Sequence, residues 1–396
     1  MENEKYIQVI ENIHKELMTS ELSDNIGLHA GTSGVALFLA YYNRVIQGTN
    51  DISPRIMEIL EHNIERIDTG GTLHTICSGI SGFGWLCEHL RKLGMLNRVD
   101  IEFLYDLDIF LYRKMVINLK KGNYDYLHGA LGIGTYFLSR INNNEISGYL
   151  HKLFTELEKT GIPCENGAVK WISMLHRETD EKGFNISLSH GMSSIAMFLI
   201  RLYKLNFEAE RVERLLNRTI TYILGQITYA EGSISYFPSY AIESSKGKFY
   251  SRLGWCYGDL GIAHILWQAA IVLKNEVWKN IALQVLLHNT KRRDLHENGI
   301  RDAGLCHGSA GIAHIFWNLY LNTHMQEFQE TTDYWLDITM QMAKYDDGLA
   351  GFKAWRAYGE LVKSDSLLEG VVGIGLVLLS YLKSDEIAWD ECLMLS

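Results

Sequence analysis

Residues Leu305–Leu319 read LCHGSAGIAHIFWNL, and residues Trp255–Ala269 read WCYGDLGIAHILWQA. Both stretches pass from a small polar turn through Gly-x-x-Gly into an apolar run. The glycines permit unusual dihedral angles and close backbone approach at a helix start, and a run that is apolar on nearly every side is typical of a helix buried all round. The two stretches therefore predict two copies of one buried-helix unit.

The same unit recurs along the whole chain as an internal repeat. Seven copies are present, and their lead glycines are Gly31, Gly79, Gly129, Gly191, Gly258, Gly308 and Gly370. Amphipathic stretches with charged faces lie between the copies and predict outer helices over 54–66, 99–120, 209–227, 276–288 and 331–345. Residues 167–175 and 232–240 are candidate arms of short hairpins. Buried and amphipathic helices are therefore expected to alternate.

A helix pair repeated at this interval either stacks into an open superhelix or closes into a ring. The last unit, Leu368–Leu382, is as apolar as the middle ones and lacks a polar capping face, which favours closure. We predict an all-α fold, a seven-fold α/α toroid of seven inner and seven outer helices, formed as a single domain over residues 1–396. Its seven glycine turns are expected at one end of the central cavity.

The composition excludes several classes of protein. The chain carries 37 Lys and Arg against 47 Asp and Glu, a formal charge of −10, whereas general nucleic-acid binders rely on a basic footprint. No apolar stretch approaches the roughly 18 residues of a spanning helix, and the acidic, amphipathic N-terminus is unlike a signal peptide. We expect a cytoplasmic protein with no membrane span, whose six cysteines are reduced.

Turns five and six carry potential metal ligands at matching positions of the repeat. Cys256 lies two residues before the lead glycine of turn five, and Cys306 with His307 precede that of turn six. Two thiolates and one imidazole are the three-ligand set of a catalytic zinc site whose fourth position is open. A single cysteine in such a turn is more often core filler, as we interpret Cys77 in turn two, but a pair on adjacent repeats favours a metal. We therefore predict that Zn2+ binds here.

Other polar residues near these turns are candidates for acid–base chemistry. His190 occupies the position in turn four that His307 has in turn six, and facing an open zinc position it becomes an acid or base candidate rather than a structural histidine. Asp125 precedes turn three, and its alternative role is to cap a helix. Arg252 lies four residues before Cys256, and its alternative role is to form a salt bridge. His29 and His128 lie at comparable positions in turns one and three and are interpreted mainly as structural. His264 and His314 occur at matching positions in two inner helices and are interpreted as packing or cavity-lining residues.

At these residues the sequence resembles the lanthionine synthetase C-like cyclases, and specifically the bacterial class I lanthipeptide cyclases. The resemblance covers all seven turns and is carried by Gly254–Gly261 (GWCYGDLG), Leu305–Ala313 (LCHGSAGIA), Ser189–Gly191 (SHG) and Tyr124-Asp125. The family fold is a seven-fold α/α toroid, which agrees with the repeat pattern.

The resemblance implies a zinc-dependent enzyme that adds a peptide cysteine to a dehydroalanine or dehydrobutyrine of the same peptide, giving a thioether (lanthionine or methyllanthionine) ring by Michael-type addition. Its substrate would be a dehydrated precursor peptide with a leader, and a dehydratase and an exporter would be further partners. Carried over by motif, the Zn2+ ligands would be Cys256, Cys306 and His307, and the catalytic residues His190, Asp125, Arg252 and Tyr257.

Two features depart from the family pattern. Turn four carries Ser194 in place of the second glycine, so its helix entry is expected to differ from the others. Residues 141–185 are longer and more polar than one outer helix requires, which predicts either an inserted segment that grips the leader peptide or an exposed loop.

Three alternative functions stay open at this point. A family relative that adds glutathione to dehydroamino-acid residues would use the same zinc and histidine. A non-catalytic, zinc-stabilised toroid would scaffold a dehydratase or an exporter. An isoprenoid-transferring toroid is disfavoured because the sequence has no Asp-rich run for a diphosphate.

Overall fold

Each of the seven lead glycines is the residue directly before an inner helix. The computed structural model describes residues 2–176, 179–356, 359–384 and 388–396. The inner helices are α2 (Thr32–Tyr42), α4 (Ile80–Lys92), α6 (Ala130–Ser139), α8 (Met192–Lys204), α10 (Asp259–Val272), α12 (Ser309–Thr323) and α14 (Val371–Leu382). Most of their residues are buried, because these helices are apolar on nearly every side. The predicted helix starts are confirmed.

The second glycine of the unit lets the helix start pack onto its own turn. A Cβ on Gly311 would collide with the carbonyl oxygen of Leu305, and the second glycines of five other turns meet the equivalent carbonyl. Turn four, with Ser194, nevertheless enters its helix in the same way, because Ser194 N donates to Gly191 O at 3.1 Å. The expected difference in helix entry is therefore wrong.

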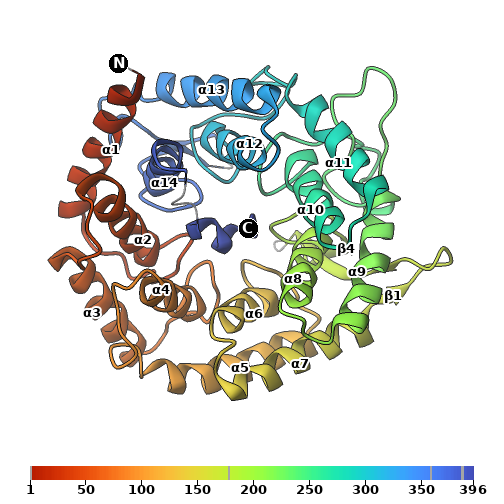
Figure 1. The fold of residues 1–396 in the computed structure, drawn as a ribbon, viewed down its shortest axis with the longest axis horizontal. Helices are drawn as coiled ribbons and strands as arrows, with labels where there is room; N and C mark the ends of the chain where they lie inside the picture. Colours follow the sequence, from red (N-terminus) through yellow and green to blue (C-terminus); the bar gives the residue numbers. More distant parts are fainter. Residues whose placement is uncertain (1, 177–178, 357–358, 385–387) are drawn as a thin grey trace.

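Seven outer helices surround the inner ones in a second layer (Figure 1). They are α1 (Glu2–Thr19), α3 (Pro54–Asp68), α5 (Leu104–Lys120), α7 (Asn144–Thr160), α9 (Ala209–Leu224), α11 (Glu276–Asn289) and α13 (Gln326–Gln341). Several predicted bounds were wrong. α5 begins later than residue 99, where the chain forms turns, and α13 begins before residue 331, because buried Phe328 anchors its first turn. The outer helices expected to end at residues 227 and 345 end earlier, at Leu224 and Gln341.

The ring is closed by both packing and backbone hydrogen bonds. Helix α14 packs against α1 and α2, so the two ends of the repeat array meet. The turns are also linked to one another, and Leu368 N of turn seven donates to His29 O of turn one at 3.1 Å. The all-α, seven-fold toroid predicted from the repeats is the observed fold.

Short strands occur beside the turns. Strands β1 (Ile162–Pro163) and β2 (Val169–Lys170) form one antiparallel pair, β3 (Ile172–His176) and β4 (Glu181–Phe184) a second, and β5 (Ala354–Trp355) and β6 (Leu361–Val362) a third. The hairpin arm predicted at 167–175 is thus confirmed. The one at 232–240 is wrong, because the Asp259 carboxylate, instead of a partner strand, accepts the backbone N–H groups of Tyr236 and Phe237 at 2.8 Å each.

The C-terminal residues occupy the centre of the ring (Figure 1). We call residues 388–396 the C-terminal plug; it begins with the 3₁₀ helix η3 (Ala388–Leu393). Two further irregular helices are the π-helix η1 (Asn43–Gln47) and the 3₁₀ helix η2 (Ile242–Ser244). Among the described residues, no helix combines the length and apolar character that a membrane span requires.

Candidate active site and metal centre

The three predicted metal ligands lie together at the turn end of the ring. The ligand atoms of Cys256, Cys306 and His307 are all within 4.8 Å of one another. Tetrahedral zinc, with bonds of about 2.3 Å to sulfur and 2.0–2.1 Å to nitrogen, separates its ligands by roughly 3.5–3.8 Å. His307 Nε2 is buried without a hydrogen-bond partner among the described residues, so this imidazole has one unsatisfied ring nitrogen. These residues therefore fit a zinc ion.

Backbone hydrogen bonds between neighbouring turns set this spacing. Trp255 N and Cys256 N both donate to Cys306 O, at 3.1 and 3.2 Å, and Cys306 N donates to Leu368 O at 2.7 Å. Glycine at position 254 lets the two turns approach, because a Cβ there would lie only 3.3 Å from the Cα of His307. The ligands are thus positioned by the toroid itself.

The charge state of the cluster already suits a metal. The pKa of Cys256 lies well below the usual thiol value because Cys306 and His307 hydrogen-bond to its sulfur. The hydrogen bond to Cys256 and burial raise the pKa of Cys306. Burial alone would lower the pKa of His307, but the Cys256 thiolate outweighs this and raises it. Cys256 is therefore held as a thiolate, the form that binds metals.

Asp125 and His190 form a second pair at the same end of the ring. His190 Nδ1 donates to Asp125 Oδ2 at 2.7 Å, and Asp125 Oδ1 accepts the backbone N–H of His128 at 2.7 Å. Burial would raise the pKa of Asp125, but the charge and hydrogen bond of His190 outweigh it and hold that pKa below its usual value. Asp125 is therefore ionised; one of its oxygens caps the turn and the other orients His190.

Tyr257 links the Asp125–His190 pair to the cluster of Cys256, Cys306 and His307. It directly follows Cys256, its ring centroid lies 6.0 Å from that of His190, and its hydroxyl accepts from Asn185 Nδ2 at 3.3 Å. Burial raises the pKa of Tyr257, so it stays a phenol and a hydrogen-bond donor. Arg252 is exposed and lines a smaller cavity of about 370 Å³ with Tyr257, and its positive charge lies near enough to Cys256 to help lower the pKa of that thiol.

A larger cavity of about 1070 Å³ opens beside the pair. Asp125, His190 and Tyr257 line one side of it, and residues of strand β3 line another. Residues 144–160 of the segment 141–185 are simply the outer helix α7, so its additional part is the pair of hairpins from Ile162 to Phe184. Residues 177–178 of that segment lie outside the described residues.

Most of the other histidines in the repeat face the lumen. His29 and His264 each contact a carbonyl oxygen of the C-terminal plug through Nε2, at 2.6 and 2.7 Å. His314 pairs with Asp390 of the plug at 3.0 Å. These three bind the plug, whereas His128 lines the large cavity, with its ring stacked 6.0 Å from that of His190.

Comparison with known proteins identifies the family to which this toroid belongs. Residues 23–394 match the family model described as lanthionine synthetase C-like protein. The chain belongs to the lanthionine synthetase C-like family. Among solved structures, nisin cyclase has a TM-score of 0.75 at 19% identity, over 98% of this chain and 96% of that one. At this identity the likeness establishes the shared fold.

Other similar structures are more distant from this lanthionine synthetase C-like chain. A sugar epimerase from a ruminal bacterium has a TM-score of 0.45 at 11% identity, over 92% of this chain and 90% of that one. An α-1,6-mannanase from Salegentibacter sp. HEL1_6 has 0.48 at 11%, over 96% and 99%. A search of curated protein sequences returned no match.

Sequence reasoning missed several residues that support the lanthionine synthetase C-like site. Asn185 and Asp302 each stand six residues before a lead glycine, and each accepts the backbone N–H two residues on, at 2.8 and 2.9 Å. Asn25 and Asn123 occupy the same position, so an Asx-turn signal was present in the repeat. Glu369 was also missed; it lies near enough to Cys306 to help raise that thiol's pKa.

Proposed function

We propose that this protein is a zinc-dependent lanthipeptide cyclase. It adds a cysteine of a dehydrated precursor peptide to a dehydroalanine or dehydrobutyrine of the same peptide, and the product is a thioether ring. The observation that carries this proposal is the cluster of Cys256, Cys306 and His307 beside the Asp125–His190 pair. The name of the structural neighbour, nisin cyclase, agrees with it.

Cys256, Cys306 and His307 would hold Zn2+ and leave one position for a substrate sulfur. Zinc bound there supplies Lewis acidity that keeps a thiol deprotonated at neutral pH. With Zn2+ bound, Cys306 would lose its proton as well as Cys256, and the negative charge of these two thiolates would favour a substrate sulfur that stays nucleophilic.

The Asp125–His190 pair supplies the proton that the addition requires. The substrate sulfur bonds to the β-carbon of the dehydro residue, the carbon–carbon π bond breaks, and the α-carbon gains one proton. The thiol has released one proton, so the reaction balances without a further reactant. Because Asp125 engages His190 Nδ1, we assign delivery of the proton to His190 Nε2. The Tyr257 phenol is our candidate donor to the developing enolate oxygen.

We assign the large cavity to the precursor peptide. Its volume of about 1070 Å³ suits several residues of an extended chain, and Trp171, Ile172 and Met174 give one wall an apolar surface. Ile172 and Met174 are 47% and 40% exposed. The part of 141–185 that follows α7 is therefore our candidate for gripping the leader peptide.

The central test compares metal content with ring formation. Wild-type protein should contain one zinc per chain and should convert a dehydrated precursor into a product that no longer reacts with a thiol-alkylating reagent, followed by mass spectrometry. The variant His190→Asn should keep the zinc and lose ring formation by about 10²-fold or more. The exposed-site control His296→Asn should retain both. Wild-type protein without zinc, or a fully active His190→Asn, contradicts the proposal.

The competing functions separate in the same assay. With glutathione present, a cyclase still gives the ring, whereas an enzyme that uses external thiols gives a glutathione adduct on the dehydro residue without ring closure. A scaffold would show no ring formation even as the wild type, although Cys306→Ala would still lower its stability because the metal is lost.

A further inference from the structure

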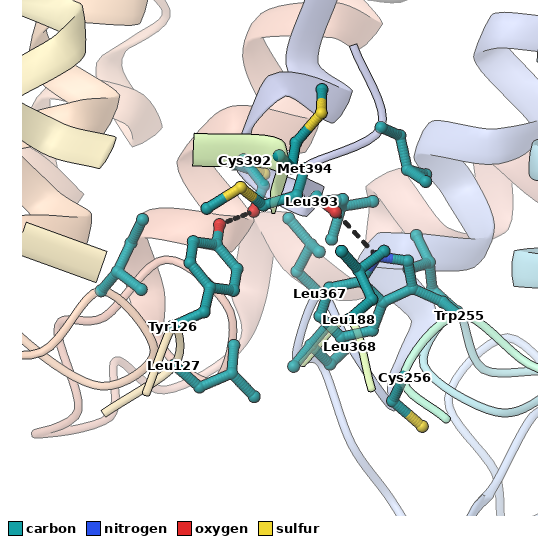
Figure 2. Packing of buried hydrophobic residues seen from close by; sticks show 14 of the residues in the cluster. Tyr126, Leu127, Leu188, Trp255, Cys256, Leu367, Leu368, Cys392, Leu393 and Met394 are labelled. Carbon is teal, nitrogen blue, oxygen red and sulfur yellow. Dashed lines mark hydrogen bonds between the residues drawn. The ribbon is translucent and has the colours of Figure 1, made fainter. Parts of the chain in front are cut away.

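The C-terminal plug is hydrogen-bonded to two of the turns that carry the site. Trp255 Nε1 donates to Leu393 O at 2.7 Å, and the Tyr126 hydroxyl donates to Cys392 O (Figure 2). Trp255 directly precedes Cys256, and Tyr126 directly follows Asp125. The plug therefore holds the neighbour of one metal ligand and the neighbour of the carboxylate that orients His190.

The repeat register shows that these two side chains are exceptions. Trp255 and Tyr126 occupy the position three residues before the lead glycine. In the other five turns this position is aliphatic: Leu28, Ile76, Leu188, Leu305 and Leu367. All seven side chains are buried, so packing alone does not require a polar aromatic group. Only turns three and five place a hydrogen-bond donor there, and these turns carry Asp125 and Cys256.

The plug is held in place by burial and by hydrogen bonds from the ring. Cys392, Leu393 and Met394 are fully buried. The carbonyls of Cys392, Leu393 and Leu395 accept from the side chains of the surrounding ring. Buried carbonyls without a partner are costly, so each of these bonds resists displacement of the plug. In Figure 2 the Trp255 side chain points toward the plug and the sulfur of Cys256 points away from it.

We propose that the C-terminal plug positions the active site, with Trp255 and Tyr126 as positioning residues that hold turn five for the metal and turn three for the Asp125–His190 pair. This inference rests on the proposed function. The Trp255–Leu393 bond should affect metal binding, because Trp255 adjoins the ligand Cys256. The Tyr126–Cys392 bond should affect proton transfer, because Tyr126 adjoins Asp125. Residues that orient a metal ligand from behind it typically change metal affinity or activity by 10- to 100-fold when altered.

The first test measures metal binding without turnover. Trp255→Phe removes the indole N–H and keeps an aromatic ring, and it should raise the zinc Kd about tenfold in competition with a chelator. The Co2+-loaded variant should also show an altered visible absorption spectrum. The matched control is Trp317→Phe, which removes an indole bond to a backbone carbonyl of helix α14, Ser380 O at 3.2 Å, instead of a bond to a carbonyl of the plug. Its zinc Kd should stay within about twofold of wild type.

The second test measures turnover with metal binding held constant. Tyr126→Phe should leave the zinc Kd within about twofold and lower kcat for ring formation about tenfold. The control Tyr41→Phe removes another buried hydroxyl, bonded to His89 Nε2 at 2.9 Å in the wall of the ring, and should keep the wild-type kcat.

The outcomes separate this inference from the proposed function. Suppose that the wild-type protein binds zinc and forms rings. Unchanged metal binding in Trp255→Phe and unchanged kcat in Tyr126→Phe would then overturn the positioning role alone. Equal changes in the Trp255 and Trp317 variants also overturn it, because they indicate a general loss of stability. Wild-type protein that binds no zinc overturns the proposed function instead.

Discussion

Asp125 stands where two other turns carry serine. Ser187 and Ser366, each four residues before a lead glycine, accept the backbone N–H three residues on at 3.2 Å each. Asp125 makes the same bond with Oδ1, and its second oxygen is left for His190 Nδ1. One substitution within the repeat thus converts a turn cap into a turn cap that also orients a histidine.

Replacing Asp125 by the serine of the other turns separates these two roles. Asp125→Ser should keep the turn cap, so the free energy of unfolding should change by only about 1 kcal/mol. Ring formation should fall by about 10²-fold, because His190 loses the carboxylate that fixes its orientation. The control Ser366→Ala removes a cap without touching the pair, and it should lose stability but retain activity. Urea unfolding and the ring-formation assay measure both; retained activity in Asp125→Ser would refute the role of the pair.

At the scale of the helical element, six of the seven units carry a second glycine that packs directly against the backbone of its own turn. Gly311→Ala should lower the free energy of unfolding by about 3 kcal/mol, because its Cβ collides with the backbone of Leu305. Gly148→Ala is the matched control: it lies in α7 with no atom within 4 Å of its Cβ, so it should stabilise by about 0.5–1 kcal/mol. Chemical denaturation of both variants tests this, and equal effects would contradict the packing role.

The seven lead glycines explain why the inner ring was predictable from sequence. They recur in register with apolar runs, so the starts of all seven inner helices and the approach of Cys256, Cys306 and His307 in turns five and six followed from one pattern. The start of α13 did not, because it depends on Phe328 packing against the ring. The Asp125–His190 bond joins residues 65 positions apart in different turns, and the role of the lumen histidines depends on a plug that has no repeat signal.

At the scale of the whole molecule, the plug gives the toroid a histidine-lined interior. Burial lowers the pKa of His29 and of His264 to about 4. The Leu395 carbonyl and Asp390 raise the pKa of His264, and His314 and Lys204 lower it, but burial has the largest effect. Both histidines are therefore neutral in the folded ring at neutral pH, because burial disfavours their charged form.

The low pKa values of His29 and His264 should make the folded protein less stable in acid, because protonation of a histidine is then linked to unfolding. An unfolded histidine has a pKa of about 6.5, so between pH 6.5 and 4 the unfolded chain binds protons that folded His29 and His264 do not. The free energy of unfolding should therefore decrease as pH falls through this window, by up to about 1.4 kcal/mol per pH unit for each histidine. Above pH 7 these two groups should contribute no slope.

His264→Gln tests the contribution of one of these histidines. Glutamine retains an N–H that can reach Leu395 O but does not titrate, so the slope of unfolding free energy against pH should decrease by about one histidine's share, whatever the variant's stability at pH 7. His296→Gln, at an exposed position, should keep the wild-type slope. Urea unfolding at several pH values from 4 to 7.5 measures the slopes. An unchanged slope in His264→Gln would mean that the lumen histidines do not cause the acid sensitivity of the plugged ring.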